Sequence, residues 1–148
     1  MPKSTIPLIA RAHHHAHRTA IVQPRGDGTD VAFTYRDLLA ASSRVAAVLL
    51  NGQQDLHEAR VAYLVPPGFD YVALQWGIWR AGGIAVPLCP SHPRPEWEYV
   101  VDDSQATIVV AHPDYAATLG AIAAERGVRF LVSSEVLTHS APDGHGLP

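Results

Sequence analysis

The sequence predicts an α/β protein in which an N-terminal hairpin precedes repeated strand–helix units that form a mainly parallel sheet. Short β-branched or apolar runs alternate with helical patterns along most of the chain, an order typical of parallel sheets covered by helices. Two of the short runs instead flank a turn-rich loop, which indicates a hairpin. The 148 residues, 47% of them hydrophobic and 17% charged, are enough to bury one core.

The N-terminal third is predicted to contain a short helix, the hairpin and a longer helix. We expect an amphipathic helix over residues 7–17 and hairpin strands at 20–23 and 31–34. The longer helix begins at Thr34, because Asp37 lies three residues further on, the spacing of a capping box.

This longer helix has one apolar face and a clear end. Leu38, Val45 and Leu49 fall on the same side of it, as expected for a helix that packs on a core. Asn51 and Gly52 are suited to a left-handed cap, so we place the end of the helix there.

The remaining two thirds are predicted to alternate between strands and helices. A helix over residues 70–80 is apolar nearly all round, which predicts burial on more than one side. Residues 1–137 are assigned to one partial domain, and residues 138–148, rich in Gly, Pro and His, to a linker-like tail. The other expected elements are strands at 60–65, 84–88, 107–111 and 128–132, helices beginning near Pro95 and running from Pro113 to Gly127, and one turn at 133–137.

Composition excludes several classes of protein. The net charge is −3, and no basic patch is interleaved with aromatic residues, so we expect no nucleic-acid partner. No run approaches the ~20 apolar residues that a membrane span needs. Lys3 is the one lysine, so the body of the chain lacks the lysine of a Gly-Lys-Ser/Thr phosphate loop.

Two groups of polar residues are candidates for chemistry, and neither is convincing. His13 and His17 would lie one turn apart on a helix and could chelate a metal, but a third ligand is missing nearby. A polar helix face is the simpler interpretation, and adventitious metal binding stays open. Asp102 and Asp103 are adjacent on a helix, point to different sides, and therefore suit helix-end solvation better than acid–base catalysis.

A lone thiol and one strand–helix junction complete the candidates. Cys89 is expected to be a buried thiol at the end of a strand, and a single cysteine cannot form an internal disulfide. Residues 66–70 join a strand to a helix, where many α/β proteins bind phosphate. One glycine and an acid at the helix start disfavour such a site, so we assign no catalytic, cofactor-binding or metal residue.

Three motifs in order carry a family resemblance. Residues 33–38 (FTYRDL) are similar to a "(L/F)TY-x-(E/D)L" motif, residues 80–88 (RAGGIAVPL) to "KAG-x-x-xVPL", and residues 99–104 (YVVDDS) to "Y-x-(L/V)-x-DS". Together they resemble the N-terminal segment of the adenylate-forming, AMP-dependent acyl-CoA synthetases and ligases. Residues 75–79, 91–93 and 103–105 look most like the malonyl-CoA synthetase branch.

The resemblance implies an ATP-dependent acid–CoA ligase in the complete enzyme, with Mg and CoA as further cofactors. An acyl-adenylate forms first, and the thiol of CoA then displaces AMP. The family's phosphate loop and catalytic lysine are not among the matched residues, so this segment is expected to be inactive alone and to bind no cofactor tightly. The resemblance gives Tyr35, Gly82, Gly83 and Pro87 structural roles.

Alternatives remain open for the role of the segment. It could be a non-catalytic short form, or an interaction module that docks on the full enzyme, or an independent nucleotide-binding α/β module. Its expected partners are the remainder of the ligase domain and, through an exposed sheet edge, itself. An intracellular location is favoured, and the cytoplasm most of all. The basic, acid-free residues 1–18 keep a mitochondrial location open, and a peroxisomal location also stays open.

Overall fold

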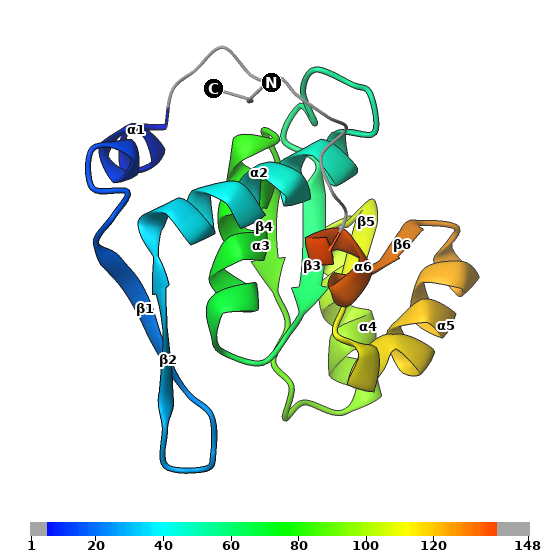
Figure 1. The fold of residues 1–148 in the computed structure, drawn as a ribbon. Coiled ribbons are helices and arrows are strands. Elements are labelled where there is room, and N and C mark those ends of the chain that lie inside the picture. Colours follow the sequence, from blue (N-terminus) through cyan, green and yellow to red (C-terminus); the bar gives the residue numbers. More distant parts are fainter. Residues whose placement is uncertain (1–5, 139–148) are drawn as a thin grey trace.

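A computed structural model of the chain, which describes residues 6–138, confirms the predicted α/β architecture (Figure 1). A two-stranded hairpin precedes a four-stranded parallel sheet, and helices cover both faces of that sheet. Lys3 and residues 139–148 of the predicted tail lie outside the described residues, and Thr138, the first residue assigned to that tail, ends α6. The elements are α1 (Pro7–His13), β1 (Thr19–Pro24), β2 (Asp30–Thr34), α2 (Tyr35–Leu50), β3 (Arg60–Leu64), α3 (Phe69–Arg80), β4 (Ile84–Pro87), α4 (Arg94–Asp103), β5 (Ile108–Ala111), a 3-10 turn (Pro113–Tyr115), α5 (Ala116–Arg126), β6 (Arg129–Val132) and α6 (Ser133–Thr138).

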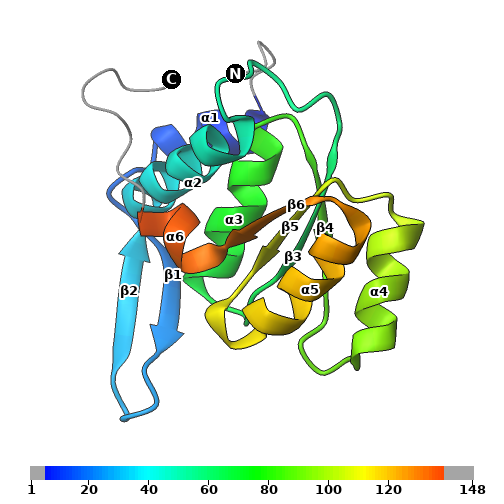
Figure 2. The same ribbon diagram turned by 90° about the vertical axis from the view of Figure 1, so that its right-hand side faces the viewer.

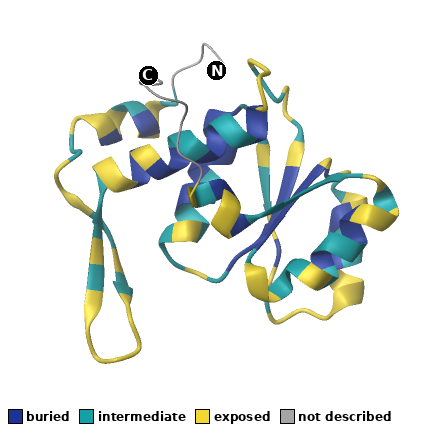
Figure 3. Ribbon diagram, turned by 45° about the vertical axis from the view of Figure 1, so that its right-hand side comes forward, coloured by how far each residue is buried: buried dark blue, intermediate teal, exposed yellow. Residues whose placement is uncertain are grey.

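The parallel sheet has the strand order β4-β3-β5-β6, with β3 and β5 at its buried centre. Side chains alternate between its faces, as they must in a pleated strand. Val61 and Tyr63 of β3 pack with α2 and α3, whereas Ala62 and Leu64 pack with α4 and α5. Figure 2 shows these two helical layers on opposite sides of the sheet, and Figure 3 shows that burial concentrates along the central strands.

The hairpin extends from the body of the molecule and is attached to it at one end (Figure 1). β1 and β2 pair antiparallel, with Thr19 opposite Thr34 and Pro24 opposite Asp30. Phe33 stacks on Phe69 at the start of α3, with ring centroids 4.1 Å apart. An isolated two-stranded hairpin is marginally stable, so this contact with α3 holds the hairpin in place.

Local sequence signals determine the helix ends as predicted. Thr34 and Asp37 form a complete capping box at the start of α2, and Asn51 ends α2 in the left-handed region with φ of 47°. At the end of α3, Gly82 has φ of +84°; its N–H donates to Trp79 O, and the Gly83 N–H donates to Ile78 O. This pair of bonds is a Schellman motif, in which glycine avoids the strain that a Cβ would cause.

Helices α2 and α3 make the most extensive contact between elements. A Cβ on Gly77 would overlap the side chain of Val45 and stand 3.0 Å from Ser42 O. One turn further on, buried Arg80 donates from Nη1 to Leu39 O at 2.8 Å and to Ser42 Oγ at 2.9 Å. Burial lowers the pKa of Arg80, so these bonds to α2 offset part of the desolvation of its charge.

The helix predicted over residues 7–17 is too long, because α1 ends at His13. Residues 14–18 instead form successive turns, in which the His15 N–H donates to Ala12 O and the Arg18 N–H to His15 O. The Ala16 carbonyl accepts from the Arg36 N–H at the start of α2. This tertiary bond turns the chain toward β1, and residue periodicity alone could not reveal it.

We expect Gly77→Ala to destabilise the protein by about 3 kcal/mol or more, because the added methyl group overpacks the contact between α2 and α3. Urea unfolding followed by circular dichroism measures the loss. Gly120→Ala is the matched control in α5: its Cβ would lie 3.3 Å from Phe130 Cε1, and the helix propensity of alanine offsets that crowding. The control should change stability by less than about 1 kcal/mol, and equal effects of the two changes would contradict the packing account.

Candidate functional site

The carboxyl ends of β3 and β5 are where this sheet topology favours a binding site. The chain leaves β3 for α3 on one face and leaves β5 for α5 on the other, so the two connections diverge. Ligands of open α/β sheets bind at such switch points. The side chains here are therefore the ones to examine.

His112 follows β5 directly and is the polar side chain that the sequence analysis missed. Its Nδ1 accepts a hydrogen bond from the Asp114 N–H at 3.1 Å, which fixes the neutral Nε2–H tautomer. In that state the 3.5 Å approach of Nδ1 to Asp114 Oδ2 is not an ion pair. A histidine directly after a buried β-branched run was the available signal.

Asp70, in the first turn of α3, interacts electrostatically with His112. Desolvation raises the pKa of Asp70, and the charge that His112 carries when protonated opposes that rise. A carboxylate and an imidazole can exchange a proton with a ligand. A nucleophile or phosphate cradle beside them does not appear among residues 6–138.

The strand–helix junction at residues 66–70 is occupied by the hairpin. The Gln23 side chain reaches it from β1, and its Oε1 accepts from the Phe69 N–H at 2.9 Å. A Cβ on Gly68 would stand 2.7 Å from the same oxygen. One of the N-terminal donors that a phosphate could use is thus already bonded to the protein, which adds to the predicted acid at the helix start as a reason against phosphate.

Cys89 is exposed, so the predicted buried thiol is wrong. β4 ends at Pro87, and Cys89 belongs to the turn that leads to α4. Its carbonyl accepts from Trp97 Nε1 at 2.8 Å, which holds the backbone while the side chain faces solvent. Ser91 Oγ lies 3.1 Å from the thiol sulfur, and this hydrogen bond lowers the pKa of Cys89.

Asp102 forms an ion pair with Arg126 of α5 and does not form an acid–base pair with its neighbour. Arg126 Nε lies 2.6 Å from Oδ1, and Nη2 lies 3.0 Å from Oδ2, a bidentate arrangement. The hydrogen bonds from Arg126 lower the pKa of Asp102. Asp102 therefore links α4 to α5 at the protein surface, where such a pair contributes little to stability.

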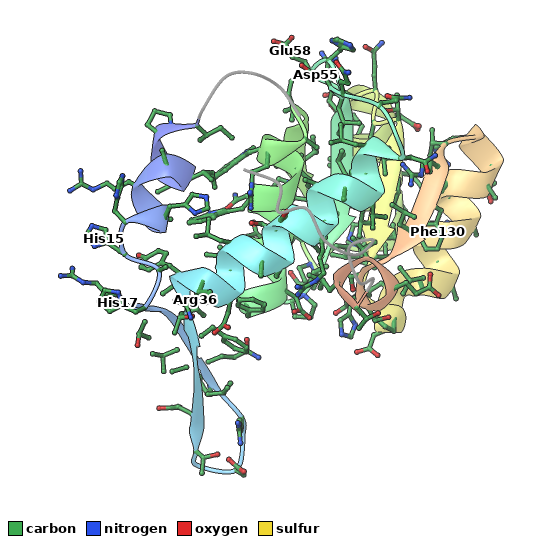
Figure 4. All side chains as sticks on the ribbon, turned by 45° about the horizontal axis from the view of Figure 1, so that its top comes forward. His15, His17, Arg36, Asp55, Glu58 and Phe130 are labelled. Carbon is green, nitrogen blue, oxygen red and sulfur yellow. The ribbon has the colours of Figure 1, made fainter. Side chains whose placement is uncertain are left out.

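The histidines do not have the spacing that a helical metal site requires. His13 is the last residue of α1, and His17 lies beyond the turn, so the two are not one helical turn apart. His15 and His17 lie at the outer side of the molecule (Figure 4). Within residues 6–138 no group of three or more His, Cys, Asp or Glu side chains could hold a metal ion.

Residues 6–138 thus form the scaffold of an open α/β sheet, with local polar groups at its carboxyl edge. The chain belongs to the AMP-binding enzyme family, whose model matches residues 8–145. This confirms the family predicted from the three motifs.

The chain is similar to a malonate–CoA ligase and to MatB. It is 38% identical over 133 residues to the mitochondrial malonate–CoA ligase of Xenopus laevis, a match over 87% of this chain and 22% of that relative. Apo MatB from Rhodopseudomonas palustris is 25% identical with a TM-score of 0.76, over 95% of this chain and 29% of that chain. ATP-bound MatB from the same organism is 25% identical with a TM-score of 0.69, over 90% and 28% of the two chains. The chain therefore spans about a fifth to a third of the length of these relatives.

Cys89 should react in the folded protein. We expect a thiol reagent such as DTNB to modify one cysteine in native buffer, because the side chain is exposed. Ser91→Ala should slow the reaction near pH 8, since loss of the hydrogen bond raises the thiol pKa and lowers the thiolate fraction. Labelling that requires denaturant would contradict the exposed position.

The Asp102–Arg126 ion pair should make the free energy of unfolding depend on pH. Folding lowers the pKa of Asp102. The stabilisation is therefore present above the pKa of Asp in the unfolded chain, and it is lost as pH falls through the pKa of Asp102 in the folded chain. Asp102→Asn should lower the urea midpoint slightly at pH 7 and leave it unchanged near pH 2. The adjacent Asp103→Asn, whose side chain makes no ion pair within residues 6–138, is the control. Equal shifts for both variants at pH 7 would contradict the pairing.

Proposed function

We propose that this chain is the N-terminal segment of an ATP-dependent acid–CoA ligase of the malonate-activating type. The observation that carries the proposal is the match of residues 8–145 to the AMP-binding enzyme family. Malonate is proposed as the acid because a malonate–CoA ligase is among the relatives. In the complete enzyme, the carboxylate attacks ATP to give an acyl-adenylate and pyrophosphate, and CoA then displaces AMP.

The proposed contribution of this segment is structural. ATP and Mg supply the activating chemistry in the complete enzyme, and ATP is present in one MatB structure. What supports weak nucleotide binding at the strand–helix junction is that Gln23 Oε1 already accepts the Phe69 N–H there. The segment alone is therefore proposed to be inactive and to bind ATP, Mg and CoA weakly.

A non-catalytic short form that docks on a full-length ligase is the second candidate. The observation that favours it is that residues 6–138 contain a four-stranded parallel sheet with helices on both faces. An independent nucleotide-binding module is less well supported, because the same Gln23 contact opposes phosphate binding at the junction. Residues 1–137 are proposed as the partial domain, with residues 138–148 as a linker to the remainder.

An intracellular location is proposed for the complete protein. The mitochondrial malonate–CoA ligase among the relatives supports mitochondria as the compartment, alongside the cytoplasm. Within residues 6–138, no helix has the length and apolar character to cross a membrane.

The purified chain should produce no AMP or pyrophosphate from ATP, Mg²⁺, malonate and CoA. The reason is that the family's phosphate loop and catalytic lysine are not among its matched residues. Pyrophosphate release measures the reaction, and the mitochondrial malonate–CoA ligase of Xenopus laevis is the positive control. Malonate-dependent ATP–pyrophosphate exchange by this chain alone would overturn the proposal of an inactive segment.

A chimera tests the ligase assignment itself. Residues 6–138 replace the matching segment of the Xenopus laevis malonate–CoA ligase, and that ligase lacking the segment is the negative control. We expect the chimera to form malonyl-CoA and the truncated enzyme to form none. A folded chimera that stays inactive would contradict the scaffold role.

A further inference from the structure

We propose that the 148-residue polypeptide by itself forms a dimer in which β6 of one copy pairs antiparallel with β6 of a second copy. The inference rests on the proposed function, in which the remainder of the ligase would normally cover this segment. The chain spans 22% of the Xenopus laevis relative, so that cover is absent from the isolated polypeptide.

β6 is an edge strand whose outward backbone groups have no partner strand within residues 6–138. The Arg129 N–H donates inward to Thr107 O at 3.1 Å. Because successive N–H groups of a strand point to opposite sides, the Phe130 and Val132 N–H groups point outward. The Phe130 carbonyl points the same way. An exposed row of this kind is a template for another strand.

The side chains of β6 hold the strand rigidly in position. Phe130 packs against α5, where its Cε1 lies 3.3 Å from the Cβ position of Gly120 (Figure 4). Arg129 donates to Leu49 O and to Val48 O of α2, at 2.9 Å each. A preorganised edge loses little conformational entropy when it pairs.

The opposite edge of the sheet is protected. The Ile84 N–H of β4 donates inward to Ala59 O, so Ala85 and Pro87 face outward. Pro87 has no N–H to offer, and proline on an edge strand prevents pairing there. The contrast between the two edges favours β6 as the surface that associates.

The pair is self-complementary about a two-fold axis. With Leu131 opposite its own copy, each Val132 N–H faces the Phe130 carbonyl of the other chain, and the contact is closed and isologous. Two four-stranded sheets then become continuous. A four-residue edge buries less than a standard interface of about 1,600 Å², so we expect dissociation in roughly the micromolar range or weaker.

Sedimentation equilibrium of the purified chain up to about 1 mM tests the dimer. We expect the apparent mass to rise toward that of a dimer with concentration. Val132→Pro removes the outward N–H and should weaken association at least tenfold. Val132→Thr keeps the N–H and the branched shape and should associate like the parent. Ala85→Pro alters the β4 edge and should also associate like the parent.

A parent chain that stays monomeric would overturn the proposal, as would a dimer that Val132→Pro leaves intact. If Val132→Pro fails to fold, amide hydrogen exchange of the parent decides. Exchange at Phe130 and Val132 should slow at least tenfold from dilute to concentrated protein, while exchange at Ala85 stays constant. Unchanged exchange at both β6 amides would reject the pairing. Neither result bears on ligase activity, which the chimera tests separately.

Discussion

Gly77 allows α3 to lie directly against α2, and much of the molecule depends on that approach. The side chain of Val45 and the carbonyl of Ser42 occupy the space that any larger residue would need. The same approach brings the Arg80 guanidinium within reach of Leu39 O and Ser42 Oγ, so a buried charge joins the two helices. It also fixes the start of α3, on which Phe33 and Gln23 of the hairpin rest.

The parts of the fold that follow from neighbouring residues were predictable. The capping box at Thr34 and Asp37, the left-handed Asn51 and the glycine pair after α3 depend on spacings of a few residues. The candidate site was less predictable, because its contacts join distant parts of the chain. Gln23 meets Phe69 across 46 positions, and no local pattern announces that bond. The burial predicted for Cys89 failed for a related reason, since its exposure depends on how the turn to α4 leaves the sheet.

The family motifs in this chain coincide with packing and turn positions. Gly82 and Gly83 close α3, Tyr35 opens α2, and Asp102 joins α4 to α5. Arg80 stands where the family motif commonly has lysine, and its guanidinium is buried between helices. The planar guanidinium group donates to two acceptors in a fixed geometry, whereas a lysine ammonium group fixes the positions of its acceptors less strictly. A family motif can therefore be recognised by the packing and turn positions that it occupies.

Arg129 bonds to the end of α2 from a strand that is synthesised much later than α2. Its guanidinium supplies donors to the Leu49 and Val48 carbonyls at the end of α2, across 80 and 81 positions of the chain. Chains emerge from the ribosome N-terminus first, so α2 is made long before the residue that completes its final turn. Until β6 is translated, those carbonyls must be solvated by water. In the nascent chain, those two carbonyls therefore exchange water for the Arg129 guanidinium only after β6 has been made.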